Sequence, residues 1–298
     1  MATDSAMAAQ PLTKTVAASS FWQDSLRRLR HHPVGMIGLV LVVLLVLLGI
    51  FGPYLAPYDP NEINFDIRFA PPSLAHPMGA DDFGRDVLSR IMVGARVSIQ
   101  VGIIAVGIAA TVGTTLGLLA GYSSRPVDEV VMRTMDVLFA FPAILLAIAI
   151  MAALGKGVTN AMIAIGIVYT PIFARIARGS VLALRGQEFV EAARAIGVGH
   201  LRILFRHIFP NATAPLIVEV SLSLAFAILA EAALSFFGLG TQPPDPSWGR
   251  MLSEGRAYFR QSAWLGIFPG LAIMFTVMGF NFLGDGLRDV LDPRMKNT

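Results

Sequence analysis

The stretch that decides the fold is VGMIGLVLVVLLVLLGIFGPYL, residues 34–55, which carries no charged side chain. About 20 consecutive apolar residues suffice for a helix to cross the roughly 30 Å of bilayer hydrocarbon, so this run predicts a transmembrane helix. It is too long for the core of a secretory signal, and no small-residue cleavage site follows it. The whole chain of 298 residues has the same character, with 55% hydrophobic residues, 14% charged residues and a mean hydropathy of +0.65. A soluble domain carries about a quarter charged residues, so the composition predicts a polytopic membrane protein.

Outward from this run, further apolar stretches of similar length recur along the chain. We predict an all-α membrane protein with about six transmembrane helices and no soluble catalytic domain. The predicted spans are 34–55, 97–121, 131–154, 161–179, 212–238 and 264–284.

The segments between these spans suggest three regions. Residues 1–33 are expected to form a cytoplasmic tail and a surface helix, with Phe21, Trp22, Leu26 and Leu29 at near-helical spacing. Residues 34–95 hold the first span and a loop rich in Pro and Asp, and 96–298 hold the remaining spans with one long loop at 180–211. Fifteen of the 23 Lys and Arg residues fall on the side of the N-terminus, which predicts cytoplasmic N- and C-termini.

Several function classes find little support. The chain has no cysteine, which excludes disulfides and thiolate metal sites, and a net charge of +3 gives no reason to expect nucleic-acid binding. No phosphate-binding GxxxxGK[ST], metal-binding HExxH or serine GxSxG motif occurs, and all five histidines lie outside the predicted spans, so we expect a non-catalytic subunit.

Asp81, Asp82 and Asp86 are either ligands of a hard cation or, as we prefer, caps of turns and helix starts. Asp285 is expected to pair locally with Arg288, or Arg288 with Asp289.

The loop at 180–211 is expected to form two short amphipathic helices joined at Gly197, which suits a helix C-cap. The first helix places Phe189, Ala193 and Ile196 on one face, and Pro210 is expected to close the second. The second helix has an apolar stripe, with two arginines on a different face; these residues are Leu201, Leu204, Phe205 and Ile208, and Arg202 and Arg206. Two interpretations stay open: a plug for a groove in another protein, or a helical hairpin on lipid headgroups.

Polar and small residues inside the spans are a second set of candidates. Glu219 and Glu231 fall in the fifth span, where a carboxylate needs a partner or a cavity, so at least one is expected to line a translocation path. The alternative is that each is protonated or paired within the bundle. Gly113, Gly117 and Gly121 recur every four residues and predict close helix packing, within this chain or against a partner. Pro142 and Pro171 lie inside predicted spans, without an assigned role.

The sequence EAARAIG (191–197), followed by Pro210, resembles the EAA loop of the permease subunits of bacterial ABC importers. The matching positions are Glu191, Ala192, Ala193, Gly197 and Pro210; the sequence departs from the general pattern at His207 and Phe209. This resemblance implies that the loop couples to a separate ATPase that binds ATP and Mg²⁺, with Glu188, Arg202 and Arg206 in the same coupling surface. It also implies a five-helix permease core behind one N-terminal helix.

Three further segments narrow the resemblance. Residues 76–98, 236–252 and 280–296 are similar to signatures of the dipeptide, oligopeptide and nickel permease group, in its C-type branch. The group implies a bacterial inner-membrane heterodimer with a second homologous permease, two ATPase subunits and an extracytoplasmic binding protein. Expected cargoes are dipeptides or short oligopeptides; glutathione, a nickel chelate, an opine or a sugar are alternatives. A proton-driven transporter using Glu219 and Glu231 is a further alternative, although the chain shows no clear internal repeat.

Overall fold

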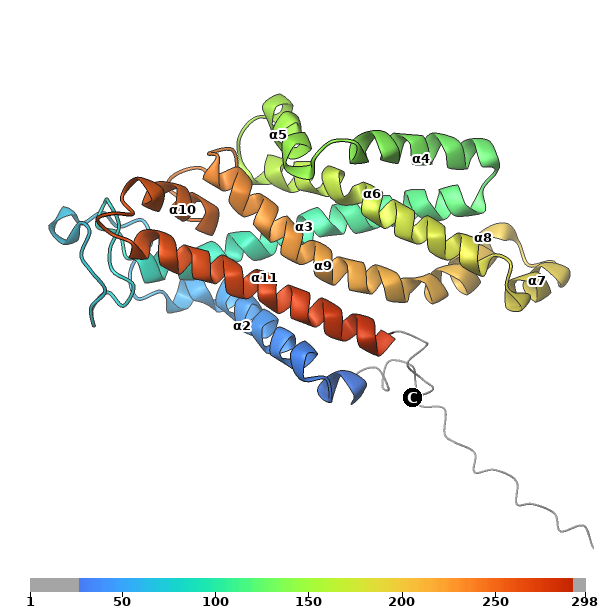
Figure 1. The fold of residues 1–298 in the computed structure, drawn as a ribbon, viewed down its shortest axis with the longest axis horizontal. Helices are drawn as coiled ribbons and strands as arrows, with labels where there is room; N and C mark the ends of the chain where they lie inside the picture. Colours follow the sequence, from blue (N-terminus) through green and yellow to red (C-terminus); the bar gives the residue numbers. More distant parts are fainter. Residues whose placement is uncertain (1–26, 292–298) are drawn as a thin grey trace, which may run out of the picture.

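The computed structural model describes residues 27–291, and this part of the chain is helical without a named strand. The predicted tail and most of the surface helix, including Phe21 and Trp22, lie outside the described residues. The elements, shown in Figure 1, are α2 (Pro33–Leu55), η1 (Phe65–Ile67), α3 (Val87–Tyr122), α4 (Arg125–Phe139), α5 (Ala143–Leu154), α6 (Val158–Leu184), α7 (Glu188–Ala195), α8 (His200–Arg202), η2 (Ile203–Ile208), α9 (Phe209–Phe236), α10 (Trp248–Ala257) and α11 (Trp264–Leu291).

Five continuous helices are long and apolar enough to cross a membrane: α2, α3, α6, α11 and the stretch His200–Phe236. A sixth crossing is possible only if α4 and α5 count together, because they are bent by 95° at the break between them. The predicted span 131–154 is thus two helices with a sharp bend between them rather than one continuous helix. Pro142 lies at the break as the N-cap of α5, with ψ 130°, rather than inside a span. Proline cannot donate a backbone hydrogen bond and disfavours helical geometry in the residue before it, which accounts for the break.

The predicted span 97–121 extends back to Val87, so α3 is longer than expected. Its 36 residues rise about 54 Å. Asp86 caps it by accepting a hydrogen bond from the backbone N–H of Ser89 at 2.8 Å. The turn before it also forms as expected, with Gly84 in the left-handed region at φ +74°.

The glycine stripe of α3 lies directly against α6. A side chain at Gly117 would overlap the carbonyl oxygen of Ala174, and one at Gly113 would overlap that of Thr170. At Gly121 a Cβ atom would stand 2.8 Å from Cβ of Val181. The two backbones approach this closely only because the stripe has no side chains, and the stripe serves packing within this chain.

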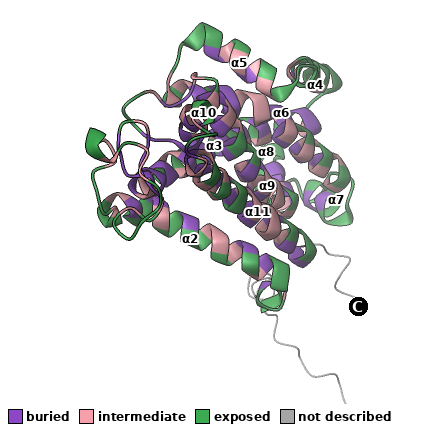
Figure 2. Ribbon diagram, turned by 60° about the vertical axis from the view of Figure 1, so that its left-hand side comes forward, coloured by how far each residue is buried: buried purple, intermediate pink, exposed green. Residues whose placement is uncertain are grey.

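The bundle has two distinct ends. Residues 56–86 and α10 lie at one, called the α10 end, where α2 finishes beside the start of α3 through Gly52 and Met92. The start of α2 and the finish of α11 lie at the other, called the α7 end, where His32 contacts Asp289. In Figure 2 buried residues concentrate in the middle of the bundle, whereas α4 and α7 are coloured largely as exposed.

Candidate functional site

The candidate coupling loop (180–211) starts within the last turns of α6, and its first separate helix is α7, whose end is fixed by Gly197. This glycine has φ +80°; its N–H donates to the carbonyl of Arg194 at 2.9 Å, and the N–H of Val198 donates to that of Ala193 at 3.0 Å. These two bonds form a Schellman motif, which satisfies the last carbonyls of the helix and favours glycine. Glu188 and Glu191 lie in the first turn, where negative charge complements the helix dipole.

The loop packs on the bundle through a different set of side chains than the sequence pattern predicts. Val190 and Ala193 of α7 are buried, and they join the main hydrophobic core. Three residues beyond α8 join the same core: Ile203, Leu204 and Ile208. Each predicted apolar face is therefore divided, with part of it anchoring the loop and part of it facing outward.

The outward part carries four large apolar side chains that no other described residue covers. The exposed fractions are 41% for Phe189, 82% for Ile196, 71% for Leu201 and 58% for Phe205. The charged side chains around them are exposed as well: Glu188, Glu191, Arg202 and Arg206. We name these eight residues the α7–α8 surface. A cluster of exposed apolar residues with a polar rim is typical of a protein interaction site.

The second helix of the loop does not end at Pro210, contrary to the prediction. His200–Phe236 is one continuous helix, and Pro210 lies in its interior. The reason is a π-helical turn at η2, where the N–H of Phe209 donates to the carbonyl of Leu204. The Nδ2 of Asn211 also donates to the carbonyl of His207 at 2.6 Å, so the proline is tolerated without a break.

Two polar contacts fasten the loop to the end of α3. The Nη1 of Arg185 donates to the carbonyl of Gly121 at 3.2 Å. The hydroxyl of Tyr122 lies 3.3 Å from Nδ1 of His200. Since α7 follows α6 after three residues and α8 continues into α9, the loop is joined to three long helices.

The two carboxylates of α9 have different surroundings. Glu231 is fully buried; its Oε1 accepts a hydrogen bond from the hydroxyl of Ser235 at 2.6 Å, and Thr241 lies at 3.5 Å. Its Oε2 has no hydrogen-bond partner among the described residues. Glu219 is partly buried and accepts from the hydroxyl of Ser223 at 2.9 Å. A path-lining role for either residue stays a prediction.

The signature segment 76–98 builds a buried charge network at the α10 end, which sequence reasoning missed. Asp81 accepts backbone N–H bonds from Phe83 and Arg85 and pairs with the Arg85 guanidinium at 2.6 Å. Arg90, 1% exposed, donates to the carbonyl of Pro60 at 2.8 Å and lies 3.9 Å from Glu254 of α10. The spacing of these residues gave no signal of their contact with α10, which lies more than 150 residues further along the chain.

Neighbouring carboxyl groups complete this network. Burial, and then the charge of Asp81, raise the pKa of Asp82 above its usual range, and Arg85 partly offsets the effect. Asp86 accepts from His76 at 2.9 Å in addition to capping α3. The carboxylates of Asp81 and Asp86 thus serve turns, a helix cap and ion pairs.

The predicted local ion pair near the end of α11 is wrong. Asp289 lies 3.1 Å from Nε2 of His32, across the interface of α11 with α2. Within residues 27–291 neither Asp285 nor Asp289 forms an ion pair with Arg288. The helices α2 and α11 approach closely at Gly35 and Gly286, which brings the two distant side chains together.

Comparison with known proteins agrees with this arrangement. Residues 113–297 match the family described as "Binding-protein-dependent transport system inner membrane component", and residues 20–72 match the "N-terminal TM domain of oligopeptide transport permease C". The dipeptide transport system permease protein DppC of Alkalihalophilus pseudofirmus is 48% identical over 94% of this chain and 92% of the relative. The glutathione transport system permease protein GsiD of Pectobacterium atrosepticum is 43% identical over 98% of this chain and 97% of the relative.

A solved structure shares the fold. A chain from the inward-facing MetNI methionine ABC transporter superposes with a TM-score of 0.57 at 16% identity, covering 68% of this chain and 96% of that chain. At this identity the likeness concerns the fold alone. The family matches, the relatives and the helical architecture together show that this chain belongs to the inner membrane components of binding-protein-dependent transport systems and is a permease subunit of an ABC importer.

Proposed function

We propose that this permease imports dipeptides or short oligopeptides and forms half of their translocation path. Support comes from the relatives DppC and GsiD, which are named for dipeptide and glutathione transport and match nearly the whole chain. Glutathione is itself a small peptide, so both names point to short peptides as cargo. The other half of the path is a second homologous permease, and an extracytoplasmic binding protein delivers the substrate.

The α7–α8 surface is the docking site for the ATPase, and this exposed apolar cluster is the observation that carries the proposal. Its anchored half belongs to the core of the bundle, so the exposed half is held in a fixed orientation. Phe189, Ile196, Leu201 and Phe205 would fill a cleft in the partner, while the surrounding charges form a polar rim. Two such contacts, one per permease, would engage two ATPase subunits that bind ATP and Mg²⁺; this chain contributes no nucleotide site.

The α7 end faces the cytoplasm in this proposal, and both termini lie on that side of the inner membrane. The first long helix begins at this end, at Pro33 of α2, and the last finishes there, at Leu291 of α11. The same end carries the arginine-rich segments of the coupling loop, as the positive-inside rule requires of a cytoplasmic side.

A cross-linking experiment tests the docking site. Because the chain has no cysteine, Glu191→Cys gives a single reactive thiol in this subunit. In the purified complex we expect this variant to cross-link to an ATPase subunit, whereas a thiol at Ile50, an exposed residue of α2, does not. Absence of any ATPase among the cross-linked products of Glu191→Cys would refute the docking site.

A transport assay tests its importance. Phe205→Ala is expected to lower ATP-dependent dipeptide uptake in proteoliposomes about tenfold, since exposed aromatic anchors dominate interface energies. Phe275→Ala is the matched control, because Phe275 is an equally large exposed residue on α11, far from the loop. Equal losses in both variants would contradict the assignment. Uptake that persists without ATP but collapses with a proton ionophore would favour the secondary transporter instead.

A further inference from the structure

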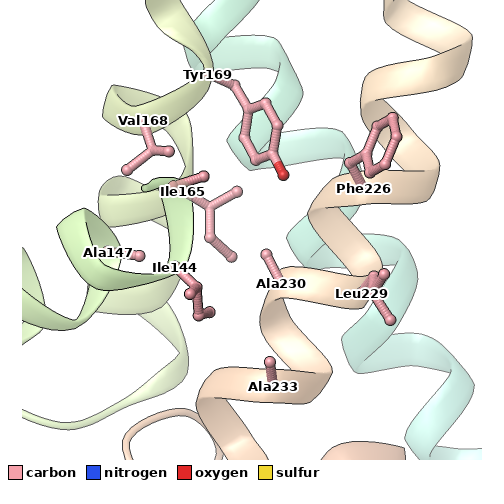
Figure 3. A pocket seen from close by; sticks show the side chains of 10 residues that line it. Ile144, Ala147, Ile165, Val168, Tyr169, Phe226, Leu229, Ala230 and Ala233 are labelled. Atoms are coloured by element: carbon pink, nitrogen blue, oxygen red, sulfur yellow. The ribbon is translucent and has the colours of Figure 1, made fainter. Parts of the chain in front are cut away.

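A cavity of about 260 Å³ lies between three membrane helices, and the mechanism above does not use it. Its wall is apolar except for one hydroxyl group, that of Tyr169, which Figure 3 shows pointing into the space between α6 and α9. The lining residues are Ala143, Ile144 and Ala147 of α5, Ile165, Val168 and Tyr169 of α6, and Phe226, Leu229, Ala230 and Ala233 of α9.

Small residues keep this space open. Alanines line it on both α5 and α9, at positions where larger side chains would close it. The space is open on one side, where Phe226 is 52% and Leu229 46% exposed, so a group from outside this chain can enter it. An engineered apolar cavity of about 150 Å³ binds benzene, so 260 Å³ is enough for a large apolar side chain.

The hydroxyl of Tyr169 decides between the possible occupants. It has no hydrogen-bond partner among the described residues, and it lies near the middle of α6 (Val158–Leu184). A lipid tail or an apolar helix of the second permease would cover this group without satisfying it, which costs about 1–3 kcal/mol. A peptide brings carbonyl and amide groups together with its side chain, and it can satisfy the hydroxyl while filling the cavity.

The helix before α5 is fixed to α6 by ion pairs. Through the 95° bend α5 follows α4, and α4 is tied to α6 by two ion pairs. Arg178 donates to the two carboxylate oxygens of Asp128 from Nε at 2.5 Å and Nη2 at 2.7 Å, and Arg175 donates to Asp136 at 2.8 Å. These ion pairs hold α4, from which α5 follows, against α6, and α6 leads into the candidate coupling loop.

We propose that this cavity receives an apolar side chain of the peptide during passage, and that the Tyr169 hydroxyl bonds the peptide backbone at its mouth. This inference rests on the proposed function, since it requires a peptide as cargo. Tyr169 is then a residue that determines specificity. Glu231, buried against Ser235 and Thr241, does not line this cavity.

The test compares two peptides, glycylglycine and glycylphenylalanine, in proteoliposomes that contain the complete transporter with its binding protein. Ala230→Leu fills the cavity, and we expect it to lower uptake of glycylphenylalanine about fivefold or more while glycylglycine changes less than about twofold. Tyr169→Phe removes only the hydroxyl and is expected to lower uptake of both peptides about fivefold. For each peptide, the uptake rate of the variant is divided by that of the unaltered transporter. This ratio cancels any preference of the binding protein for one of the two peptides.

Ala149→Leu is the matched control, since Ala149 is an exposed residue of α5 that does not line the cavity. Equal loss of both peptides in Ala230→Leu, with loss of the second permease on purification, would assign the cavity to the permease interface and overturn the proposal. Unchanged uptake in both Ala230→Leu and Tyr169→Phe would assign it to lipid and also overturn it. Uptake of glycylglycine by the unaltered transporter tests the proposed function separately, and its absence would overturn both.

Discussion

The two ends of the bundle treat charged residues in opposite ways. At the α10 end, Arg85 and Arg90 are buried and paired with Asp81 and Glu254, so the segment 76–98 and α10 are locked together within one chain. At the α7 end, Arg202 and Arg206 are exposed beside uncovered apolar side chains. A region that satisfies its own charges can serve as a scaffold, whereas a region that leaves apolar surface exposed needs another protein to cover it.

Removing a buried arginine should give the largest difference between the ends. Arg90→Ala removes a fully buried guanidinium that donates to the carbonyl of Pro60 and shares the charges of Asp81 and Glu254 with Arg85, and we expect it to destabilise the protein by about 3–5 kcal/mol. Arg206→Ala at the α7 end should change stability by less than about 0.5 kcal/mol, because that side chain is exposed. Denaturant unfolding in detergent measures both, and equal effects would remove the distinction between the ends.

A substitution in the glycine stripe of α3 is expected to have an intermediate effect on stability. Gly117→Leu forces α3 away from Ala174 of α6, and overpacking of this kind costs about 1–3 kcal/mol. Gly107→Leu is the control on the same helix, since a Cβ atom there meets nothing within 4 Å. A Gly107→Leu variant as unstable as Gly117→Leu would show that helix insertion, rather than the glycine stripe, is affected.

The smallest effect is expected at a partly exposed ion pair on the side of the α7 end. Arg178 forms a bidentate ion pair with Asp128 through Nε and Nη2, yet the two side chains are 33% and 22% exposed. Solvent screening limits such pairs to about 1 kcal/mol, so Arg178→Ala should shift the unfolding midpoint only slightly. A loss as large as that of Arg90→Ala would mean that burial does not account for the contrast.

Local chemistry predicted some features of the fold and missed others. The uncharged run 34–55 and the C-cap at Gly197 follow from the solvent and from backbone geometry, and both appear as expected. Two prolines behave in opposite ways. Pro142 interrupts the helix within a predicted span, whereas the helix continues through Pro210, where the prediction had it end. The difference lies in the π-helical turn and the side chain of Asn211, which a proline rule cannot anticipate.

The candidate site was likewise predicted only in part from the sequence. The EAA pattern indicated the candidate coupling loop through resemblance, but it did not indicate that Leu204 is buried while Phe205 is exposed. Amphipathic spacing gives the faces of an isolated helix, and only the packing of the bundle decides which face is covered. For the same reason the sequence identified Glu231 as unusual without revealing its contact with Thr241, and it gave no sign of the cavity at Tyr169.

The uninterrupted helix from His200 to Phe236 has a mechanical consequence. Its 37 residues form a rod of about 55 Å, so a tilt of about 5° at one tip displaces the other by about 5 Å. Had Pro210 broken the helix, a small push on the loop would have been absorbed by bending at that joint. Because the helix continues through Pro210, the same tilt reaches Phe226 and Ala230 at the cavity as a displacement of about 3 Å.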